Sequence, residues 1–351
     1  MSNNSLKASA SLIDAISVIE STVKRLAVVV SEDGRVLGTL TDGDIRRHII
    51  QGGKLDASVA LAMNVEPVVA QTKTSDTELQ KRLVIHNIRA LPLVDEHGIY
   101  VRTMHEMELG SSDRATLVEK SFSVAVIMAG GEGSRLRPLT DNLPKPMLEI
   151  NGVPLLERQI RGLVNIGIKL VYISVNYLGE VIENYFGDGN KFGIEIRYLH
   201  ETKKLGTAGA LSLLPTLDDL RSVLVMNGDI LTTSNFLNLL HFHNDLSSAL
   251  TIGAVEYHIE IPFGVIQNVG VKVTGLKEKP SQHFLCNAGI YALTRATLLK
   301  IPNDTFYNMT DLIVQCTRDD DVVSVFPVHE YWSDIGTSTD LDRAREEFDT
   351  L

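Results

Sequence analysis

Two basic residues follow closely on a glycine-rich stretch near the middle of the chain. Gly130, Gly131 and Gly133 come after an apolar run of strand length, and Arg135 and Lys145 lie a few residues further on. Because glycine has no Cβ, the backbone N–H groups of such a loop can approach a ligand closely. N–H groups with nearby cations suit a polyphosphate. The stretch therefore predicts a phosphate-binding loop in which Arg135 and Lys145 stabilise a phosphoryl-transfer transition state.

Two common glycine-rich loops do not fit this stretch. A Walker A loop requires Gly-Lys-Ser or Gly-Lys-Thr, and the chain contains neither. The dinucleotide-binding fingerprint G-x-G-x-x-G would require a glycine at position 136, where the chain has Leu136. The loop must therefore belong to another class of phosphate-binding site.

Two aspartates stand in positions that favour metal binding. Asp229 follows the apolar run 223–226, and Asp334 lies just before the expected last helix, in the run Trp-Ser-Asp-Ile-Gly-Thr. A carboxylate at the end of a buried strand is costly unless it is paired or binds a cation. Mg²⁺ is typically held by one or two carboxylates and by the phosphates of a substrate. The alternative is a turn residue for Asp229 and a helix cap for Asp334.

The elements that must hold these residues alternate between strand and helix from residue 122 onward. Strands are expected at 124–128, 170–175, 194–199, 223–226 and 250–256, and helices at 155–164, 180–186, 206–214 and 236–244. Further strands are expected at 263–267, 271–276, 287–293 and 322–328, before a helix at 338–348. This alternation is typical of an α/β domain with a mostly parallel sheet. Ligands of such sheets bind beyond the carboxyl ends of the strands, where the glycine loop and Asp229 both fall.

Residues 1–118 predict a separate α+β module that is built from a repeat. Helices are expected at 11–21, 45–51 and 77–86, and strands at 26–30, 36–40 and 91–94. Gly34 and Gly98, each in a turn, are 64 residues apart. A helix–strand–turn–strand unit of this size is a supersecondary module that is used twice. Residues 119–122 are the expected linker, within a polar connector that can form a short helix at 115–120.

Composition restricts the class of protein. The length of 351 residues suggests two domains or slightly more. The net charge of −11 argues against a nucleic-acid surface. No apolar run approaches the roughly 20 residues of a membrane span, and the start of the chain lacks the features of a secretory signal. Two cysteines, Cys286 and Cys316, form neither a disulfide framework nor a metal cluster, which fits a reducing cytoplasm.

The glycine-rich stretch also resembles a known signature. The run from Gly130 to the Pro-Lys-Pro around Lys145 matches GGxG-[ST]-R-L-x-P-L-T…P-K-P. It is similar to the pyrophosphorylase loop of sugar-1-phosphate nucleotidyltransferases, and the resemblance extends over residues 122–351. It implies a Rossmann-like, GT-A-like fold for residues 123–351 and Mg²⁺ as the cofactor. It also implies transfer of a nucleotidyl group from a nucleoside triphosphate to a sugar 1-phosphate, with release of pyrophosphate.

This resemblance implies a role for each matching residue. Asp229 and Asp334 would hold the metal ion, Arg135 the leaving pyrophosphate and Lys145 the α-phosphate. The residues expected to contact the nucleotide are Ala129, Gly130, Gly131, Gly133, Ser134, Glu201, Gly206, Thr207 and Asn227. The residues expected to contact the sugar and its phosphate are Gly264, Glu278, Lys279 and Asn287.

One residue and a further resemblance indicate which nucleobase the triphosphate carries and which sugar 1-phosphate accepts the nucleotide. Glu201 stands where uridylyl and thymidylyl relatives commonly have glutamine. An ionised carboxylate only accepts hydrogen bonds, which suits the adjacent N1–H and N2–H₂ donors of guanine. The chain resembles glucosamine-1-phosphate and mannose-1-phosphate guanylyltransferases, so GTP is the favoured donor. The alternatives are a UDP-, dTDP- or CDP-sugar pyrophosphorylase and, in another class, a non-catalytic subunit that senses nucleotide sugars.

The N-terminal module resembles a tandem pair of CBS domains. Gly38, Thr41 and Asp44 have the spacing G-x-x-T-x-x-D, and in that family the Thr and Asp contact an adenosine-type nucleotide. The second copy departs from the pattern, because His105 and Glu108 stand where a threonine and an aspartate are expected. A CBS pair that only dimerises the enzyme, or packs on it, is the alternative. A homo-oligomer is expected in either case.

Overall fold

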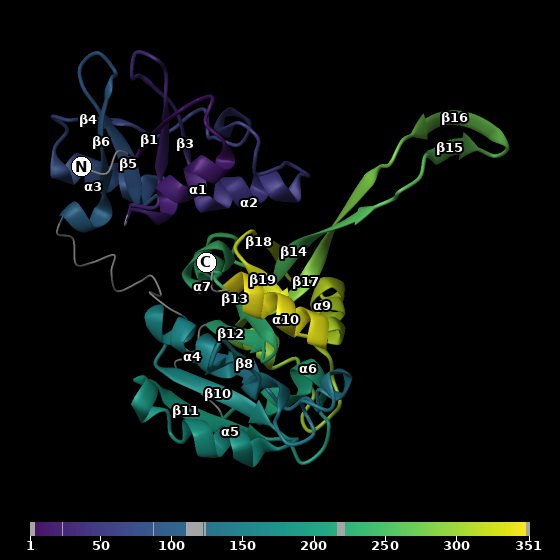
Figure 1. Cartoon of the computed structure of the whole chain (residues 1–351). Coiled ribbons are helices and arrows are strands. Elements are labelled where there is room, and N and C mark those ends of the chain that lie inside the picture. Colours follow the sequence, from purple (N-terminus) through teal and green to yellow (C-terminus); the bar gives the residue numbers. More distant parts are fainter. Residues whose placement is uncertain are drawn as a thin grey trace. The chain divides into compact units, whose positions relative to one another are not determined.

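The computed structural model describes residues 4–22, 24–86, 88–109, 122, 124–215 and 222–348. The chain divides into two compact units, Met1–Glu119 and Lys120–Leu351 (Figure 1). Of the predicted linker 119–122, only residue 122 lies within the described residues, and the helix predicted at 115–120 lies outside them. Among the helices of the described ranges, none combines the length and the apolar character that a membrane crossing requires.

The first unit contains two copies of one small α+β module. The first copy comprises β1 (Ser5–Lys7), α1 (Leu12–Glu20), β2 (Ala27–Val30), β3 (Val36–Leu40) and α2 (Asp42–Ile50). The second comprises β4 (Ala70–Gln71), α3 (Asp76–Ile85), β5 (Ala90–Val94) and β6 (Tyr100–His105), followed by a 3₁₀ turn at Glu106–Leu109. Each copy forms a three-stranded sheet in which the first pair of strands is parallel and the second pair is antiparallel.

The two copies correspond residue by residue. The register of the antiparallel pair shifts between Val29 and Val30 in the first copy and between Leu93 and Val94 in the second. Arg35 and Ile99, which occupy the same place in the two copies, form a β-bridge with each other. The structure thus contains the repeat that the spacing of Gly34 and Gly98 predicts.

The second unit is built on a seven-stranded sheet. Its order is β11 (Glu195–His200), β10 (Leu170–Val175), β7 (Val124–Met128), β12 (Ser222–Asn227), β17 (Ser281–Thr294), β14 (Leu250–Glu260) and β18 (Val323–Val328). The first four of these strands are parallel to one another, and β17 runs antiparallel to both of its neighbours. The mostly parallel α/β sheet expected from the alternation of strands and helices is confirmed.

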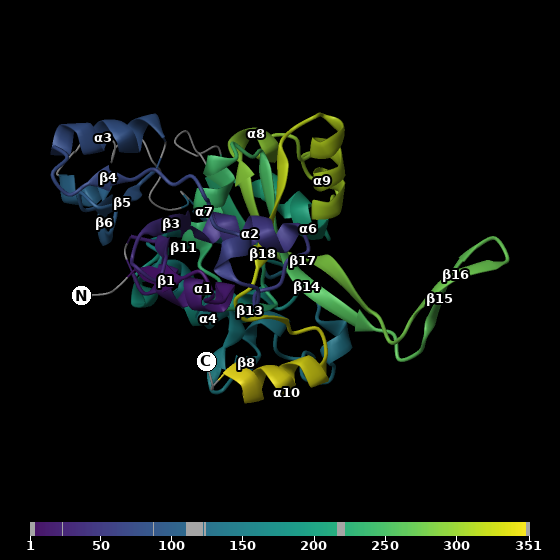
Figure 2. The ribbon, with the colours of Figure 1, turned by 90° about the horizontal axis from the view of Figure 1, so that it is seen from above.

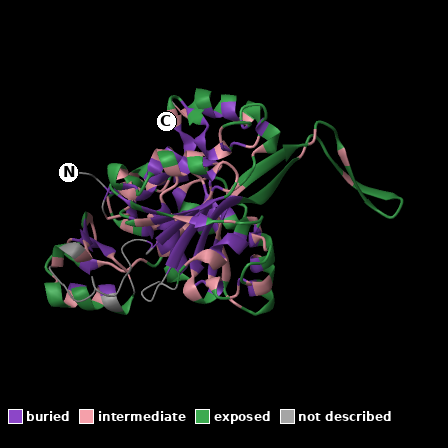
Figure 3. Cartoon of the chain, turned by 90° about the horizontal axis from the view of Figure 1, so that it is seen from below, coloured by how far each residue is buried: buried purple, intermediate pink, exposed green. Residues whose placement is uncertain are grey.

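Helices cover both faces of this sheet, and the strands between them are buried (Figures 2 and 3). One face packs against α4 (Leu155–Asn165), α5 (Gly179–Phe186) and α7 (Phe236–Asp245). The other face packs against α6 (Gly206–Gly209), α8 (Arg295–Leu298) and α9 (Met309–Arg318). Strands buried on both faces read as continuous apolar runs, and β7 has this character in the sequence Val-Ala-Val-Ile-Met. The central strand that precedes the glycine loop is therefore among the most buried in the fold.

A small layer beside the sheet joins distant parts of the chain. The strands β13 (Ile230–Thr232) and β19 (Trp332–Asp334) form an antiparallel pair, and β8 (Glu149–Ile150) and β9 (Val153–Pro154) form another. An apolar cluster holds these strands against α10 (Ser338–Glu347) and against the loop after β7. Its buried members include Leu136, Leu148, Leu231 and Ile335.

The strands β14 and β17 continue beyond the sheet as a projecting arm (Figures 1 and 2). Their pairing runs from Leu250 opposite Leu293 to Glu260 opposite Ser281, with one register shift near Gly253. At the end of the arm lies the hairpin of β15 (Val265–Val269) and β16 (Lys272–Lys277). Both long strands extend past the predicted ranges 250–256 and 287–293, to Leu250–Glu260 and Ser281–Thr294.

Three further features of the second unit differ from the predictions or were not predicted. The helix predicted at 206–214 is a four-residue α-helix, α6, continued by a 3₁₀ turn at Ala210–Leu213, because Gly206 has a left-handed φ of +79° and the short segment lacks a side-chain cap. The helix α9 and the pair β13–β19 were not expected, since each strand of the pair has only three residues. Other 3₁₀ turns occupy Val59–Leu61, Ser134–Leu136, Lys145–Met147 and Asn190–Phe192.

Candidate active site

Two carboxylates and one ammonium group meet beside the carboxyl ends of β7 and β12. The Nζ of Lys145 lies 2.5 Å from Oδ2 of Asp229 and 3.7 Å from Oδ1 of Asp334. The Lys145 side chain is 15% exposed and that of Asp229 is 27% exposed. The structure therefore brings together the predicted catalytic lysine and both predicted metal ligands, although they come from three separate segments of the chain.

Short strands place the two carboxylates next to each other. Asp229 lies directly between β12 and β13, and Asp334 is the last residue of β19. In the β13–β19 ladder, Ile230 is directly opposite Asp334. The backbone N–H of Ile335 also donates to the carbonyl oxygen of Asp229 at 3.0 Å. The spacing of the carboxylates is thus fixed by backbone pairing.

A buried glutamine secures the turn that carries Asp229. The Nε2 of Gln159, on α4, donates to the carbonyl oxygens of Asn227 at 3.0 Å and Ile230 at 2.7 Å. The backbone N–H of Gly228 donates to the carbonyl oxygen of Met128 at 2.8 Å, which joins the turn to the end of β7. These bonds leave the turn little freedom, so Asp229 is a positioned side chain.

The glycine loop folds back over the lysine. Gly133 has a left-handed φ of +61°, and a Cβ at this position would lie 3.0 Å from the Cβ of Lys145. The hydroxyl of the buried Thr140 donates to the carbonyl oxygen of Gly133 at 2.9 Å. A glycine is needed here because another residue would be strained and would crowd Lys145. Arg135 follows in the 3₁₀ turn Ser134–Leu136 with its side chain exposed to solvent.

The electrostatics of the cluster favour an additional cation. Burial, together with the nearby charge of Asp229, raises the pKa of the Asp334 carboxyl above its ordinary value, against the opposing effect of Lys145. Within the described residues, the Oδ1 atom of Asp229 is buried and has no hydrogen-bond partner. A buried carboxylate oxygen without a partner is costly. Two carboxylates with oxygen atoms to spare match the donor set of a hard divalent cation such as Mg²⁺, so the residues present fit the metal that the sequence implies.

Glu201 lies against the glycine loop. One carboxylate oxygen, Oε1, accepts a hydrogen bond from the Ser174 hydroxyl and would lie only 2.8 Å from a Cβ on Gly130. The other, Oε2, accepts from the backbone N–H of Leu205 at 3.2 Å. The side chain is half-buried and fixed in orientation. Each oxygen retains acceptor capacity, so Glu201 can still accept hydrogen bonds from a ligand held by Gly130.

Other predicted nucleotide and sugar residues make contacts within the same unit. Asn227 ends β12, and its amide would lie 2.7 Å from a Cβ on Gly289. The side chain of Asn287 accepts from the backbone N–H of Gly289 at 2.9 Å, so both asparagines meet at one glycine. The hydroxyl of Thr207 accepts from the backbone N–H of Met309 at 2.9 Å, which occupies it in packing α6 against α9. Ala129 is buried directly after β7, whereas Gly131 and Ser134 are exposed in the loop.

Three predicted sugar-binding residues are not brought to the cluster. Gly264 precedes β15, and Glu278 and Lys279 follow β16, so all three lie on the projecting arm (Figure 1). All three are exposed. A Cβ on Gly264 would lie 2.9 Å from Oε2 of Glu278, so these residues adjoin each other. The β14–β17 ladder carries them away from the sheet that holds Lys145 (Figures 1 and 2).

In the first unit, Thr41 and Asp44 form a helix cap. The Thr41 backbone N–H and hydroxyl donate to Oδ2 of Asp44 at 2.8 and 2.6 Å, and the Asp44 N–H donates to the Thr41 hydroxyl at 3.3 Å. This reciprocal capping box starts α2. The same arrangement starts α1 and α10. The threonine and aspartate spacing is therefore explained by helix formation whether or not a nucleotide binds there.

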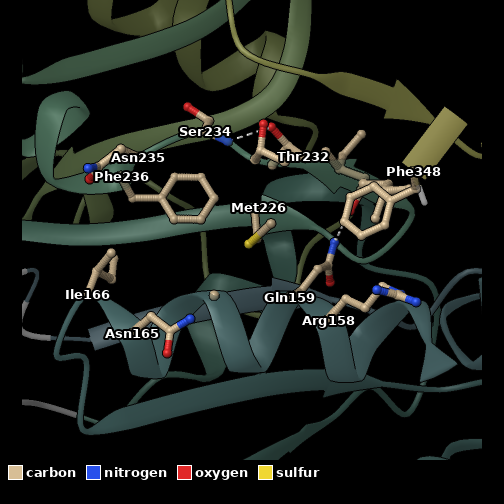
Figure 4. Close-up of a pocket in the computed structure, with 14 residues that line it drawn as sticks. Arg158, Gln159, Asn165, Ile166, Met226, Thr232, Ser234, Asn235, Phe236 and Phe348 are labelled. Atoms are coloured by element: carbon tan, nitrogen blue, oxygen red, sulfur yellow. Dashed lines mark hydrogen bonds between the residues drawn. The ribbon is translucent and has the colours of Figure 1, made fainter. Parts of the chain in front are cut away.

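Two further features of the second unit lie apart from the cluster. A pocket of about 330 Å³ lies between α4 and the segment 230–236, and Gln159 lines it (Figure 4). It contains none of the glycine-loop residues. On the arm, Glu256, His258 and His283 present ligand atoms within 4.8 Å of one another, and all three are exposed. Neither feature includes a residue that the sequence predicts for the site.

Comparison with known families is consistent with this geometry. Residues 124–350 match the nucleotidyl transferase family, a span that contains Lys145, Asp229 and Asp334. The chain belongs to the nucleotidyl transferase family. Residues 3–51 of its first unit match the CBS domain family, a span that covers the first copy of the repeat and includes Thr41 and Asp44.

Relatives of the nucleotidyl transferase unit carry related names. It is 30% identical over 226 residues to a mannose-1-phosphate guanylyltransferase of Mycobacterium tuberculosis, covering 62% of each chain. It is 32% identical over 226 residues to the catalytic subunit beta of a mannose-1-phosphate guanylyltransferase of Drosophila melanogaster, covering 62% of this chain and 60% of that one. The match therefore spans less than two thirds of the length of either relative.

The fold is also found in a solved structure. HddC from Yersinia pseudotuberculosis aligns with a TM-score of 0.52 and 26% identity, covering 65% of this chain and 100% of that chain. A second structure of HddC, complexed with GMP-PN, aligns with a TM-score of 0.51 and 25% identity over the same shares of the two chains. These alignments agree with a nucleotidyl transferase fold for the second unit alone.

The residues that support the site were not predicted from the sequence. Gln159 lies in the apolar stripe of α4 with Leu155, Leu156 and Ile160. A polar residue in such a stripe is a signal of an internal hydrogen-bonding role. The packing roles of Gly289, Leu136 and Ile335 were not predicted, although all three stand in motifs of the sequence, because their partners are distant in the sequence.

Proposed function

We propose that this nucleotidyl transferase couples a nucleoside triphosphate, GTP in preference, to a sugar 1-phosphate and releases pyrophosphate. The observation that carries the proposal is the placing of Lys145 between Asp229 and Asp334, directly under the glycine loop. A hexosamine 1-phosphate such as glucosamine 1-phosphate, or mannose 1-phosphate, is the favoured acceptor. The names of the relatives support a guanylyl transfer to mannose 1-phosphate.

The reaction requires one displacement at phosphorus. A phosphate oxygen of the sugar 1-phosphate attacks the α-phosphorus of the triphosphate, and the bond to the β,γ-pyrophosphate breaks, so pyrophosphate leaves with the electron pair. No covalent enzyme intermediate is needed, and catalysis is mainly positioning and charge neutralisation. Backbone N–H groups of the exposed Gly131 and its neighbours hold the triphosphate. Lys145 contacts the α-phosphate, and the exposed Arg135 holds the leaving pyrophosphate.

Asp229 and Asp334 would hold Mg²⁺, which supplies neutralisation of phosphate charge when it is bound. The protein prepares for this with the buried Asp229 oxygen that has no partner among the described residues. Gln159 keeps the Asp229 turn in place through its two hydrogen bonds. The ammonium group of Lys145 offsets the repulsion between the two carboxylates.

Glu201 supports the preference for guanine. Its carboxylate is fixed beside Gly130 by Ser174 and the N–H of Leu205, so its direction does not depend on a ligand. A fixed acceptor pair suits two adjacent donors, as on the guanine edge, better than the donor beside an acceptor of uracil or thymine. Glu201→Gln should lower the preference for GTP over UTP and dTTP. An unchanged ratio of kcat/KM values would remove Glu201 from base selection.

The deciding experiment is release of pyrophosphate by the full chain with Mg²⁺. GTP, ATP, UTP, CTP and dTTP are each tested with a panel of hexose and hexosamine 1-phosphates. Release with GTP and one acceptor is expected, and Arg135→Ala should lower the rate about 100-fold or more. Arg318→Ala, an exposed arginine at the end of α9, is the matched control and should keep the wild-type rate. Release of pyrophosphate only with a triphosphate other than GTP would show that the enzyme uses a different nucleobase.

One outcome would point to the other class of function. If the chain bound GTP or a GDP-sugar but released no pyrophosphate with any pair of substrates, it would be a sensor of nucleotide sugars and not an enzyme. Asp229 and Lys145 are both present and paired, which favours the enzyme. Such a sensor has no need of a metal-binding carboxylate pair.

For the first unit we propose binding of an adenosine-type nucleotide near Thr41 and Asp44. The CBS family match and the position of both residues at the start of α2 support this. Asp44→Ala should abolish the effect of the nucleotide on pyrophosphate release. Because Asp44 is also a capping residue, a thermal melt must show that the unit still folds. We also propose a cytoplasmic location, which suits the free thiols of Cys286 and Cys316.

A further inference from the structure

The projecting arm exposes an unusual amount of apolar surface. Of the 23 large apolar side chains that are exposed in the described residues, ten fall between 257 and 285. They are Tyr257, Ile259, Phe263, Ile266, Val269, Val271, Val273, Leu276, Phe284 and Leu285, each at least 41% exposed. Figure 3 shows the arm as exposed along nearly its whole length. Apolar residues concentrated in this way mark an interaction surface.

The amount of this surface is sufficient for a stable subunit contact. At roughly 150 Å² for each large side chain, the exposed parts of the ten residues offer about 900 Å². A standard interface buries about 800 Å² on each partner. If two copies exchange arms, this area is buried twice, so the arm alone can support an obligate contact.

The charge of the arm tip favours an acidic partner surface. Residues 261–280 contain three lysines, Lys272, Lys277 and Lys279, and one acidic residue, Glu278. This segment is therefore basic in a chain whose net charge is −11. The Asp229–Asp334 cluster has two carboxylates for the single ammonium of Lys145. Opposite charges of this kind orient a contact between two copies.

The same tip carries residues that are expected at the site but lie away from it. Lys145 and Arg135 are assigned to the triphosphate, so the phosphate of the sugar still needs a cation. Lys279, predicted for that phosphate, lies on the arm with Glu278 and Gly264. The ladder from Leu250 to Glu260 is continuous except near Gly253, so the arm keeps its direction away from its own sheet.

We propose that two copies of this chain exchange arms, and that Lys279 and Glu278 of one copy complete the sugar-phosphate site of the other. Exchange of an identical element is a low-cost route to a symmetric dimer. The proposal rests on the proposed function for the role of Lys279, but the contact between arm and site does not.

Complementation between two inactive variants tests the exchange. Arg135→Ala removes a loop cation, and Lys279→Ala removes the arm cation; both side chains are exposed, so neither change should impair folding. The two variants are co-expressed with different tags, and the mixed dimer is purified through both. If the arm acts in trans, one site of the mixed dimer has both residues, and about half of the wild-type activity is expected. If the arm acts within its own chain, both sites lack one residue, and no activity above that of the parent variants appears.

A second measurement does not depend on catalysis. Unlabelled and ¹⁵N-labelled full chains are co-refolded or co-expressed, and the mixed dimers are treated with a carbodiimide, which joins a lysine to a carboxylate without a spacer. Peptides that join Lys279 to Asp334 or Asp229 should carry mixed labels. Cross-links within one label class only, or none to the cluster, would overturn the exchange. Val271→Asp, at a fully exposed position of the tip, should weaken the mixed cross-link.

The outcomes separate this inference from the proposed function. If the wild type gave mixed-label cross-links but released no pyrophosphate, the arm exchange would stand and the proposed enzymatic function would be rejected. If Lys279→Ala released pyrophosphate at the wild-type rate, or if the mixed dimer released none, the exchanged site would be rejected. The proposed enzymatic function would then stand.

Discussion

Replacing Lys145 by methionine separates what this lysine does for the fold from what it does for the reaction. In the folded chain its ammonium group neutralises Asp229 at 2.5 Å and Asp334 at 3.7 Å. Hydrogen bonds between charged groups contribute about 1.5–3 kcal/mol each, and removing one partner of a buried pair costs about 3–5 kcal/mol. Because Asp229 is 27% exposed and Asp334 is 52% exposed, the lower end applies. We expect Lys145→Met to reduce the free energy of unfolding by about 2 kcal/mol, or about 4–8 °C in melting temperature for a unit of this size.

A second lysine in the same unit is a matched control. Lys300 also lies between two carboxylates, those of Asp319 and Asp321, at 2.5 and 2.6 Å, and its side chain is 22% exposed. Lys300→Met should cost a similar amount of stability, yet leave pyrophosphate release unchanged because Lys300 is remote from the loop. Lys145→Met should instead slow release about 100-fold or more. The double variant Lys145→Met with Asp229→Asn should recover much of the stability and none of the rate.

Thermal unfolding without metal measures the predicted loss of stability. Pyrophosphate release with Mg²⁺ measures the predicted loss of rate. A turnover within about threefold of the wild type in Lys145→Met would refute its contact with the α-phosphate. A melting temperature that is unchanged in Lys145→Met but lowered in Lys300→Met would refute the charge balance that we infer for the cluster.

Three other perturbations test the support of the site. Asp334→Asn should raise the melting temperature at pH 7, because burial and Asp229 raise the pKa of the Asp334 carboxyl, so that its ionised form destabilises the fold. This gain should vanish in melts below pH 3.8, the ordinary pKa of the carboxyl, where the aspartate is as neutral as the asparagine. A lower melting temperature of the variant at pH 7 would contradict this reasoning. Its pyrophosphate release should fall at least about 100-fold. Gln159→Leu removes the side-chain donor to two carbonyl groups, and it should cost about 2 kcal/mol with a lower kcat. Wild-type kcat and stability would exclude a positioning role. Gly289→Ala places a Cβ 2.7 Å from the Asn227 amide at a φ of +69°, and should cost about 1–3 kcal/mol and raise the KM for the triphosphate, whereas Gly270→Ala, at a φ of +57° with open space around it, should cost less and leave KM unchanged.

Periodicity and local motifs were enough to predict many elements of both units. The buried strand β7 and the loop after it are encoded within a few residues, because an apolar run and successive glycines determine both. The strand ranges 36–40 and 170–175 agree with β3 and β10 to the residue, since turns bound both segments. The resemblance of their two segments to the nucleotidyltransferase family indicated that Asp229 and Asp334 belong to one site, and the structure places them on either side of Lys145.

The features of the fold and of the site that could not be predicted depend on contacts between distant segments of the chain. The pair β13–β19 joins strands of three residues, which are too short to show a period, yet this pair sets the distance between the carboxylates. The direction of the arm depends on how far β14 and β17 remain paired, and the local sequence of either strand does not reveal that. The Thr-x-x-Asp spacing shows the converse difficulty, because a capping box produces the same pattern as a ligand contact.

The short ladder between β13 and β19 also determines when a newly made chain contains the complete proposed site. Asp229 and the glycine loop leave the ribosome well before β19 does, and the larger sheet can begin to assemble without it. Until Asp334 pairs opposite Ile230, one of the two carboxylates that we propose as cation ligands is missing. By the proposed mechanism, an incomplete chain cannot consume nucleotide, and activity begins only after β19 has joined the unit.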